Sequence, residues 1–257
     1  MIEQIKLIAH EAGKAIMDIY AKDFAIYDKS DSSPLTEADL AAHNIIVDGL
    51  AAISTLPVLS EESASIDWET RQQWDEYWLV DPLDGTKEFI KKNGEFTVNI
   101  ALIKHGQPVL GVVYAPALSR TYWGSLEDGA FVEDDSGIKA ISAAPHQAGD
   151  TWKVVGSRSH QSPEIKAFLD ELNGDVELVA MGSSLKLCLV ASGEAHLYPR
   201  LGPTSEWDTG AAHAVALAAG ANVTVLDPDN PFDSDPVPLT YNQKESVLNP
   251  FFLVSAK

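Results

Sequence analysis

Residues 78–89 read Trp-Leu-Val-Asp-Pro-Leu-Asp-Gly-Thr-Lys-Glu-Phe. An apolar run, which predicts a buried strand, leads into two aspartates three positions apart, Asp81 and Asp84. Hard divalent cations such as Mg²⁺ take oxygen ligands, which two carboxylates at a strand end can supply. If a helix opens at Gly85 and Thr86, their backbone N–H groups would face an anion. Metal ligands beside an anion site indicate metal-assisted phosphate chemistry, although Asp, Pro and Gly also make ordinary turns.

The composition is that of a soluble globular protein, with 257 residues, 45% of them hydrophobic and 22% charged. This length suits one large domain or two smaller ones. A single cysteine, Cys188, excludes an intrachain disulfide and favours a reducing compartment. Charged residues run through the first twenty positions, unlike a signal peptide, and no apolar run approaches the roughly 18 residues of a membrane-spanning helix. We therefore expect a cytoplasmic protein.

The formal net charge of −20 restricts the partners of this protein. Binding of a nucleic-acid polymer depends on lysine and arginine to neutralise phosphates, so we expect none. A small phosphate substrate would also be repelled unless bound cations reverse the local field. A phosphate substrate therefore implies bound metal, whereas the simpler interpretation is that the charge only confers solubility.

Hydrophobic periodicity predicts two halves that meet near residue 143. Residues 1–143 should form an α+β half with an antiparallel sheet, whose helices and strands are expected at 2–20, 36–53, 57–60, 77–80, 96–103, 108–114, 120–124 and 130–133. Residues 144–257 should form an α/β half, with strands expected at 152–155, 176–181, 195–198, near 223 and near 252, and helices at 163–172, 184–191 and 208–219.

Three more acids could join the two aspartates of the opening stretch. Glu61 follows a short strand, Asp208 begins an alanine-rich helix, and Asp39 lies in the first turn of a helix. Strand ends and helix starts are the places where side chains gather over the rim of a sheet. Each acid also has an ordinary explanation, as a solvated side chain, a helix cap or a capping-box partner. Spacing alone does not decide whether they converge.

The chain resembles the inositol monophosphatase superfamily of Mg²⁺-dependent, lithium-sensitive phosphatases. Both signatures of that family are present, at 81–86 with Phe89 following and at Trp207-Asp208 with small residues after it, and Glu61-Glu62 stands for its upstream acidic pair. A closer likeness, to the bacterial 3′(2′),5′-bisphosphate nucleotidases of the superfamily, rests on 58–62, 78–90, 94–102, 157–160, 182–186, 198–200 and 248–250. Gly210 departs from the pattern, where alanine is expected. The likeness covers essentially the whole chain and implies a layered αβαβα sandwich with a metal site between two halves.

The resemblance also implies roles for individual residues. Two or three Mg²⁺ ions would be held by Glu61, Asp81, the carbonyl of Leu83, Asp84 and Asp208. Thr86, paired with Asp39, would take the proton of the attacking water, and Glu61 would support a third, weakly bound ion. The substrate would contact Glu61, Asp84, Gly85, Thr86, Lys87, His160, Ser183, Lys186, Arg200 and Asp208. Lys186 and Arg200 suit a second phosphate. A lysine early in a predicted helix nevertheless more often lies on a solvated face, and a histidine such as His160 more often caps a loop than binds a substrate.

The implied reaction is removal of the 3′-phosphate from adenosine 3′,5′-bisphosphate, which gives AMP and phosphate. The related 3′-phosphoadenylyl sulfate is a second expected substrate, and the implied role is to clear a by-product of sulfate assimilation. The alternatives are a phosphatase for inositol or sugar phosphates and a non-enzymatic sensor of metal or nucleotide. Weak attachment to the inner membrane is implied for bacterial relatives, but this acidic chain shows no basic patch or amphipathic anchor. The oligomeric state is left open.

Overall fold

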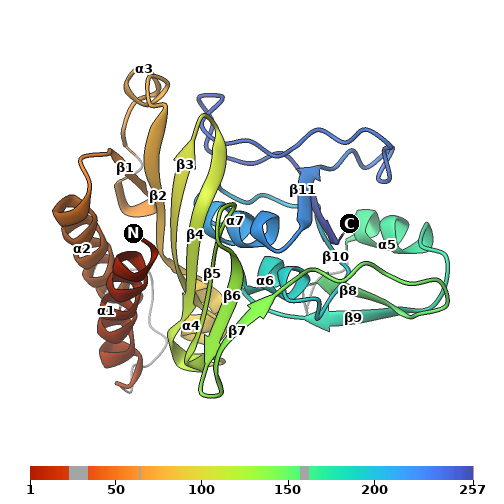
Figure 1. Cartoon of the computed structure of the whole chain (residues 1–257), viewed down its shortest axis with the longest axis horizontal. Coiled ribbons are helices and arrows are strands. Elements are labelled where there is room, and N and C mark those ends of the chain that lie inside the picture. Colours follow the sequence, from red (N-terminus) through yellow and green to blue (C-terminus); the bar gives the residue numbers. More distant parts are fainter. Residues whose placement is uncertain (23–33, 64, 157–161, 257) are drawn as a thin grey trace.

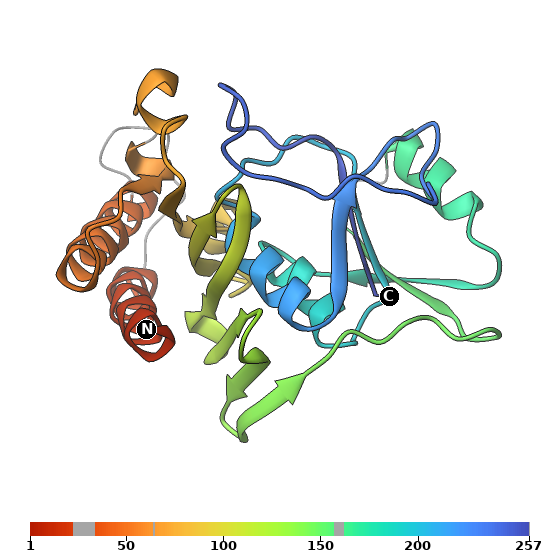
Figure 2. The same cartoon turned by 45° about the horizontal axis from the view of Figure 1, so that its top comes forward.

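The computed structural model describes residues 1–22, 34–63, 65–156 and 162–256. Five layers follow one another across the molecule (Figure 1): a helix pair, a seven-stranded sheet, a second helix pair, a five-stranded sheet and an outer helix. The same layers are visible from a second direction in Figure 2. This arrangement confirms the layered αβαβα architecture expected from the sequence.

The first layer consists of α1 (Ile2–Tyr20) and α2 (Pro34–Ile53), which pack on one face of the first sheet. Apolar side chains of α1 recur every three or four residues, so one stripe of the helix is buried. That stripe consists of Ile5, Ile8, Ala9, Ala12, Ile16 and Ile19. Helix α2 begins two residues before the predicted start, at a proline, which needs no N–H partner in a first turn.

Seven strands form the first sheet, in the spatial order β1 to β7. Their bounds are Val58–Ser60 (β1), Glu76–Asp84 (β2), Thr97–Lys104 (β3), Gln107–Ala115 (β4), Arg120–Ser125 (β5), Gly129–Asp134 (β6) and Gly137–Ile141 (β7). β1 runs parallel to β2, and the later neighbours pair antiparallel, which confirms the predicted hairpin of β3 and β4. β7 was missed, because its side chains are mostly exposed and show no apolar alternation.

The third layer is formed by α6 (Leu185–Ala191) and α7 (Gly210–Ala218), which lie between the two sheets (Figure 1). The second sheet has the order β11-β12-β10-β8-β9. Its strands are β8 (Trp152–Gly156), β9 (Val176–Ala180), β10 (Leu197–Arg200), β11 (Ala221–Val225) and β12 (Phe252–Ala256). β8 is parallel to β9 and β10, while β12 is antiparallel to its neighbours, so the partly parallel sheet is confirmed. Helix α5 (Pro163–Asp170) forms the outer layer.

Four short helices lie in the connections: η1 (Glu61–Ser63), α3 (Trp68–Arg71), α4 (Thr86–Ile90) and η2 (Pro116–Leu118). In the described part of the chain, no helix combines the length and apolarity that crossing a membrane requires. The chain passes from the first sheet to the second between β7 and β8, near the predicted boundary at residue 143. Helix α7 nevertheless packs on strands of the first sheet. The division into two domains therefore remains a prediction.

Close packing of α7 on the first sheet brings the two halves together. Gly111 of β4 makes this possible, because a Cβ atom there would lie 2.1 Å from the carbonyl oxygen of Ala211. Gly210 also lies close to β2, where a Cβ atom would be 2.8 Å from a terminal methyl of Leu79. Glycine in place of the expected alanine therefore lets the first turn of α7 approach β2.

Candidate metal and phosphate site

The two aspartates of the opening stretch lie in a bulged strand. β2 does not end at the predicted residue 80 but continues to Asp84. Its pairing with β3 passes from Asp81 opposite Asn99 to Asp84 opposite Thr97, so β2 contains one extra residue there. Pro82, which lacks an N–H group, cannot donate to the sheet ladder at this point.

The bulge determines where the carboxylates point. Residues three positions apart in a regular strand lie on opposite faces, and one extra residue restores the same face. Tyr77 and Leu79 pack with the layer of α6 and α7, so Asp81, two residues further, faces that layer as well. The bulge therefore turns Asp84 to the side where α7 begins.

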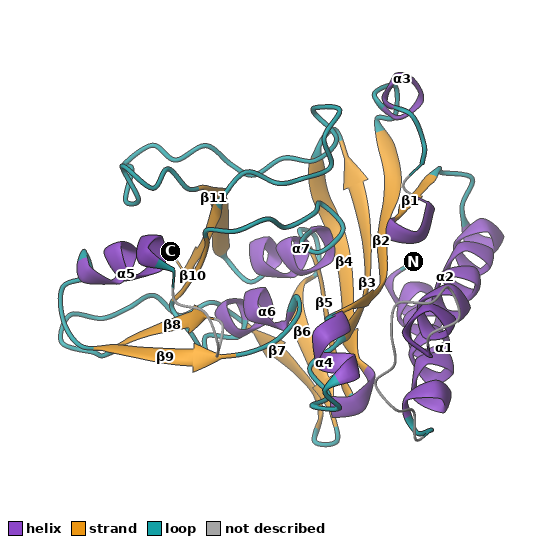
Figure 3. Cartoon of the chain, turned by 180° about the vertical axis from the view of Figure 1, so that it is seen from behind, coloured by secondary structure: helices purple, strands orange, loops and turns teal. Residues whose placement is uncertain are grey.

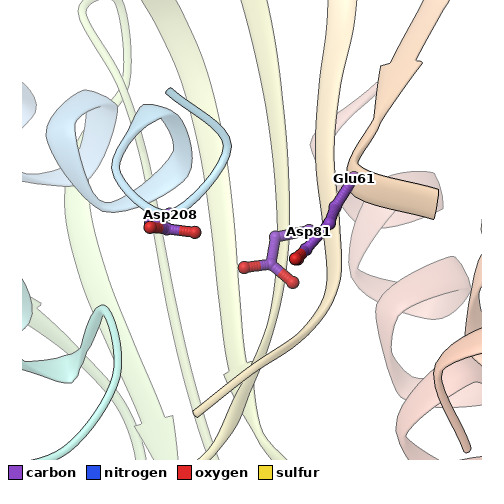
Figure 4. A group of neighbouring side chains, drawn as sticks. All are labelled: Glu61, Asp81 and Asp208. Atoms are coloured by element: carbon purple, nitrogen blue, oxygen red, sulfur yellow. The ribbon is translucent and has the colours of Figure 1, made fainter. Parts of the chain in front are cut away.

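Glu61 and Asp208 come to this place from two other elements. Ser60 pairs with Val80 in the parallel β1–β2 ladder, so Glu61 leaves β1 at the level of Asp81. Asp208 lies in the turn before α7. One carboxylate oxygen each from Glu61, Asp81 and Asp208 can be chosen so that the three lie within 4.8 Å of one another. Figure 4 shows the three side chains reaching toward a common point.

Asp84 lies beside this cluster and is held by the chain before α6. The backbone N–H of Ser184 donates to Asp84 Oδ2 at 2.5 Å. The Ser184 hydroxyl is hydrogen-bonded to Thr97 at 2.9 Å and to Asn99 Oδ1 at 2.8 Å, both on β3. Sequence reasoning missed Ser184 and Asn99 as supports of the site. The available signal was Asn99 itself, a polar residue within an otherwise apolar predicted strand.

The charges of the buried aspartates are poorly compensated. Burial raises the pKa of Asp81 well above its usual value, and repulsion by Asp84, Glu61 and Asp208 adds to this. Burial and then Asp208 raise the pKa of Asp84 to about 7, against an opposing effect of Lys186. Burial raises the pKa of Asp208 to about 6, although Asp208 accepts a hydrogen bond from the Ser205 N–H at 2.9 Å. Like charges this close need a cation to remain ionised together.

The remaining two acids extend the negative region. Partial burial, followed by the charges of Glu62 and Asp84, raises the pKa of Glu61. Burial, followed by Glu62 and Glu61, raises the pKa of Asp39 to about 8. Asp39 is therefore close enough to the cluster to feel its charge.

The donor set fits a hard divalent cation. All converging groups are carboxylates, which suit Mg²⁺, Ca²⁺ or Mn²⁺ rather than the softer metals that prefer sulfur. The Leu83 N–H donates to Asp81 Oδ1 at 3.0 Å and orients that carboxylate. The sequence-based expectation that the Leu83 carbonyl binds metal stays a prediction, as does the number of ions.

The predicted anion-binding turn is present next to the carboxylates. Gly85 has a φ of 96°, a left-handed conformation that glycine adopts readily, and α4 begins at the next residue as expected. Thr86 is exposed, and within the described residues its hydroxyl makes no hydrogen bond to Asp39. The water-activating role of this pair stays a prediction.

A cavity of about 330 Å³ opens beside Asp84 and Asp208. The other predicted substrate-binding residues that line it are Gly85, Lys87, Ser183, Lys186 and Arg200. Glu61 and Thr86 are not among its lining residues, and His160 lies outside the described residues. The cavity lining combines four acids with four cations: Asp84, Glu88, Glu95 and Asp208, and Lys87, Lys91, Lys186 and Arg200.

A second cavity of about 290 Å³ adjoins the first and shares Lys87, Lys186 and Arg200 with it. Tyr198 lines both cavities, and the apolar side chains of Val155, Ile165 and Leu178 line the second. The Lys186 ammonium lies 5.8 Å from the Tyr198 ring and donates to the Ser183 carbonyl at 3.2 Å. Arg200 is held by Thr204 Oγ1 at 2.6 Å.

Solved structures of the inositol monophosphatase family share this layered two-sheet fold. The family model matches residues 1–251, and the chain belongs to this family.

Individual relatives and solved structures match the chain within this family. The 3′(2′),5′-bisphosphate nucleotidase CysQ of Escherichia coli O157:H7 is 51% identical over 260 residues, which cover 99% of both chains. A crystal structure of CysQ from Bacteroides thetaiotaomicron, described as a bacterial member of the inositol monophosphatase family, matches with a TM-score of 0.88 and 42% identity over 100% of this chain and 97% of the other. An inositol monophosphatase from Zymomonas mobilis matches with a TM-score of 0.76 at 21% identity, over 99% and 91% of the two chains, and shows the shared fold.

Proposed function

We propose that this protein is a Mg²⁺-dependent phosphomonoesterase that removes the 3′-phosphate of adenosine 3′,5′-bisphosphate, giving AMP and phosphate. The observation that carries this proposal is a cavity whose lining combines the predicted metal ligands Asp84 and Asp208 with the cations Lys87, Lys186 and Arg200. The relatives of about half-identical sequence, named bisphosphate nucleotidases, support the choice of a nucleotide.

We propose two metal positions at the carboxylates, by likeness to the family. Glu61, Asp81 and the Leu83 carbonyl would hold one Mg²⁺, while Asp81, Asp84 and Asp208 would hold a second, and a third would depend on Glu61. Bound Mg²⁺ would polarise the phosphate and lower the pKa of water. Lithium, a small monovalent ion, would occupy a position without supplying its charge, so we propose that lithium inhibits.

The residues of the chain would handle the proton and the phosphate oxygens. The Thr86 hydroxyl would take the proton of the attacking water while passing its own proton to Asp39, which would have to be ionised to accept it. The backbone N–H groups of Gly85 and Thr86 would donate to phosphate oxygens at the start of α4. Asp84 would stay fixed by the Ser184 N–H while the phosphate is released.

The cations explain why a second phosphate would be favoured. A protein with a net charge of −20 repels a bisphosphate unless cations meet each phosphate. Lys186 and Arg200 line both cavities and would bind the 5′-phosphate through charge-assisted hydrogen bonds. Tyr198 and the apolar wall of the second cavity suit the base. The sulfated analogue 3′-phosphoadenylyl sulfate has the same anionic arrangement, and we propose it as a second substrate, with clearance of by-products of sulfate assimilation as the role.

Phosphate release from a panel of esters tests this function. We expect kcat/KM with Mg²⁺ to be highest for adenosine 3′,5′-bisphosphate and to be lost in EDTA. A higher kcat/KM for inositol 1-phosphate or fructose 1,6-bisphosphate would reject the nucleotide. No release from any ester would reject a phosphatase and favour a sensor.

Lys186→Ala tests the second phosphate contact. A hydrogen bond to a charged group contributes about 1.5–3 kcal/mol, so the variant should lose roughly 10- to 100-fold in kcat/KM on adenosine 3′,5′-bisphosphate. Adenosine 3′-phosphate, which lacks the 5′-phosphate, should lose much less. Lys104→Ala is the control, because Lys104 pairs with Glu76 at 2.7 Å and does not line either cavity. Equal losses on both esters would argue against the contact.

A further inference from the structure

The long connection between β11 and β12 returns to the first sheet. It contains neither helix nor strand (Figure 3), and in Figure 1 its dark-blue ribbon runs above α7 to the upper end of β3. Residues 239–249 of this connection lie against the turn at 204–209 that carries Asp208. They include Leu248 and Asn249 of the Leu248-Asn249-Pro250 motif.

Backbone and side-chain hydrogen bonds join this segment to the turn. Asn249 donates from its backbone N–H to the Thr204 carbonyl at 2.9 Å, and from Nδ2 to the Ser205 carbonyl at 2.9 Å. Glu206, 1% exposed, receives the Asn242 N–H at 3.0 Å on each carboxylate oxygen. Ser205 in turn donates its N–H to the Asp208 carboxylate. The residues that orient Asp208 are therefore held by the segment.

Tyr241 adds a buried chain of hydroxyl groups. Its hydroxyl donates to Thr209 Oγ1 at 3.1 Å, and Thr209 donates to the Glu206 carbonyl at 3.1 Å. His213 Nδ1 lies 2.8 Å from the Tyr241 oxygen. Because the single tyrosine proton is used toward Thr209, His213 Nδ1 is the donor in this contact. The Asn249 amide also donates to Thr209, at 3.0 Å.

The other side of the segment is attached to the first sheet. The Tyr241 N–H donates to the Gly106 carbonyl at 3.0 Å, in the turn between β3 and β4. Arg71, 3% exposed and at the end of α3, donates to Asn242 Oδ1 at 2.8 Å and to the Glu245 carbonyl. Asn242 Nδ2 donates back to the Arg71 carbonyl at 2.6 Å. The segment thus connects the layer that carries Glu61 and Asp81 to the turn that carries Asp208.

We propose that residues 239–249 act as a clamp that positions Asp208 against Glu61 and Asp81, with Tyr241 and Asn249 as positioning residues. The proposal rests on the proposed function, because it concerns the metal site of that function. Octahedral Mg²⁺ tolerates little displacement of its ligands. Partners in the outer shell of metal sites typically contribute 10- to 100-fold in affinity. Loss of one clamp contact should therefore weaken Mg²⁺ binding by about tenfold.

Mg²⁺ titrations of melting temperature on the full chain test the clamp. The variant Tyr241→Phe removes the hydroxyl that contacts Thr209 and His213. Tyr77→Phe is the matched control, because Tyr77 is also buried and its hydroxyl has no hydrogen-bond partner among the described residues. We expect the Mg²⁺ midpoint of Tyr241→Phe to rise about tenfold and that of Tyr77→Phe to equal the wild type.

A purely structural role predicts a different result. Tyr241→Phe would then lower the melting temperature equally with and without Mg²⁺ and leave the midpoint unchanged, which would overturn the clamp. If Tyr241→Phe does not fold, the same Mg²⁺ titration on Asn249→Ala, at a half-buried position, tests the clamp. A wild-type protein that does not respond to Mg²⁺ would reject the proposed function and the clamp together. A wild-type response with unshifted variants would reject the clamp alone.

Discussion

Gly111→Ala tests whether the packing of α7 on β4 determines the position of Asp208 in the metal site. An added Cβ would lie 2.1 Å from the Ala211 carbonyl oxygen, 2.8 Å from its carbonyl carbon and 2.9 Å from its Cα. All three are backbone atoms, so no change of rotamer relieves the contact. The helix and the strand must separate.

The size of the separation follows from these distances. Ordinary contact begins near 3.4 Å, so α7 has to move by about 1.3 Å, the difference between 3.4 and 2.1 Å. Overpacking of this kind costs about 1–3 kcal/mol, which corresponds to a loss of roughly 3–10 °C in melting temperature for a chain of this size. Asp208 lies just before α7 and would move with it. Mg²⁺–oxygen distances are about 2.0–2.1 Å, so we expect a loss of Mg²⁺ affinity of at least about tenfold.

Melting temperature across a Mg²⁺ titration measures both effects. Gly156→Ala is the control, because among the described residues the nearest atom to its added Cβ is a Leu178 methyl at an ordinary 3.9 Å. An unchanged melting temperature for Gly111→Ala would show that the contact is not tight. A lowered melting temperature with a wild-type Mg²⁺ midpoint would refute the idea that α7 packing places Asp208.

Two further predictions concern charge in the site. Asp84→Asn keeps an oxygen that can accept the Ser184 N–H but removes a ligand charge, so phosphate release should fall by about 100-fold or more; wild-type turnover would exclude Asp84 as a ligand. Raised pKa values of about 6, 7 and 8 for Asp208, Asp84 and Asp39 mean that the Mg²⁺-free folded protein binds protons more tightly than the unfolded chain. This stabilisation is complete below pH 3.8, the ordinary pKa of these groups, and is lost progressively up to about pH 8. Burial lowers the pKa of His213 from 6.5 to about 3, so this residue destabilises the folded protein, but only below pH 6.5. The gain in melting temperature from Mg²⁺ should therefore be larger at about pH 8.5 than at pH 6.5, and equal gains at both would contradict the charge argument.

Much of the fold could be predicted because local pattern and burial agree. The isoleucines of α1 recur at the spacing of a buried helical stripe, and the β3–β4 hairpin has apolar strands around a Lys-His-Gly-Gln turn. β7 could not be predicted in this way, since an exposed edge strand buries too little to impose alternation on its sequence. The short α3 at 68–71 offers too few residues to show a period.

The candidate site was only partly accessible from sequence. A helix start at Thr86 follows from Gly85, a residue that takes a left-handed conformation without strain. The apolar pattern predicts a strand that ends at residue 80, whereas β2 continues through Asp81 and Asp84 with one residue bulged. Pro82 was the local signal, but whether a proline ends a strand or bulges it depends on the pairing offered by β3.

Convergence of the acids is a property of contacts that are distant along the chain. Asp208 reaches Asp81 because Gly111 lets α7 lie directly on β4, and because Tyr241 and Asn249 hold the turn before that helix. No local sequence pattern around these three residues indicates that they support Asp208. A carboxylate cluster of this kind repels itself, so packing and hydrogen bonds elsewhere must hold it together until a cation binds. We infer that the contacts that oppose this repulsion are as necessary to the site as its ligands, which is why Gly111 and Tyr241 are the informative positions to change.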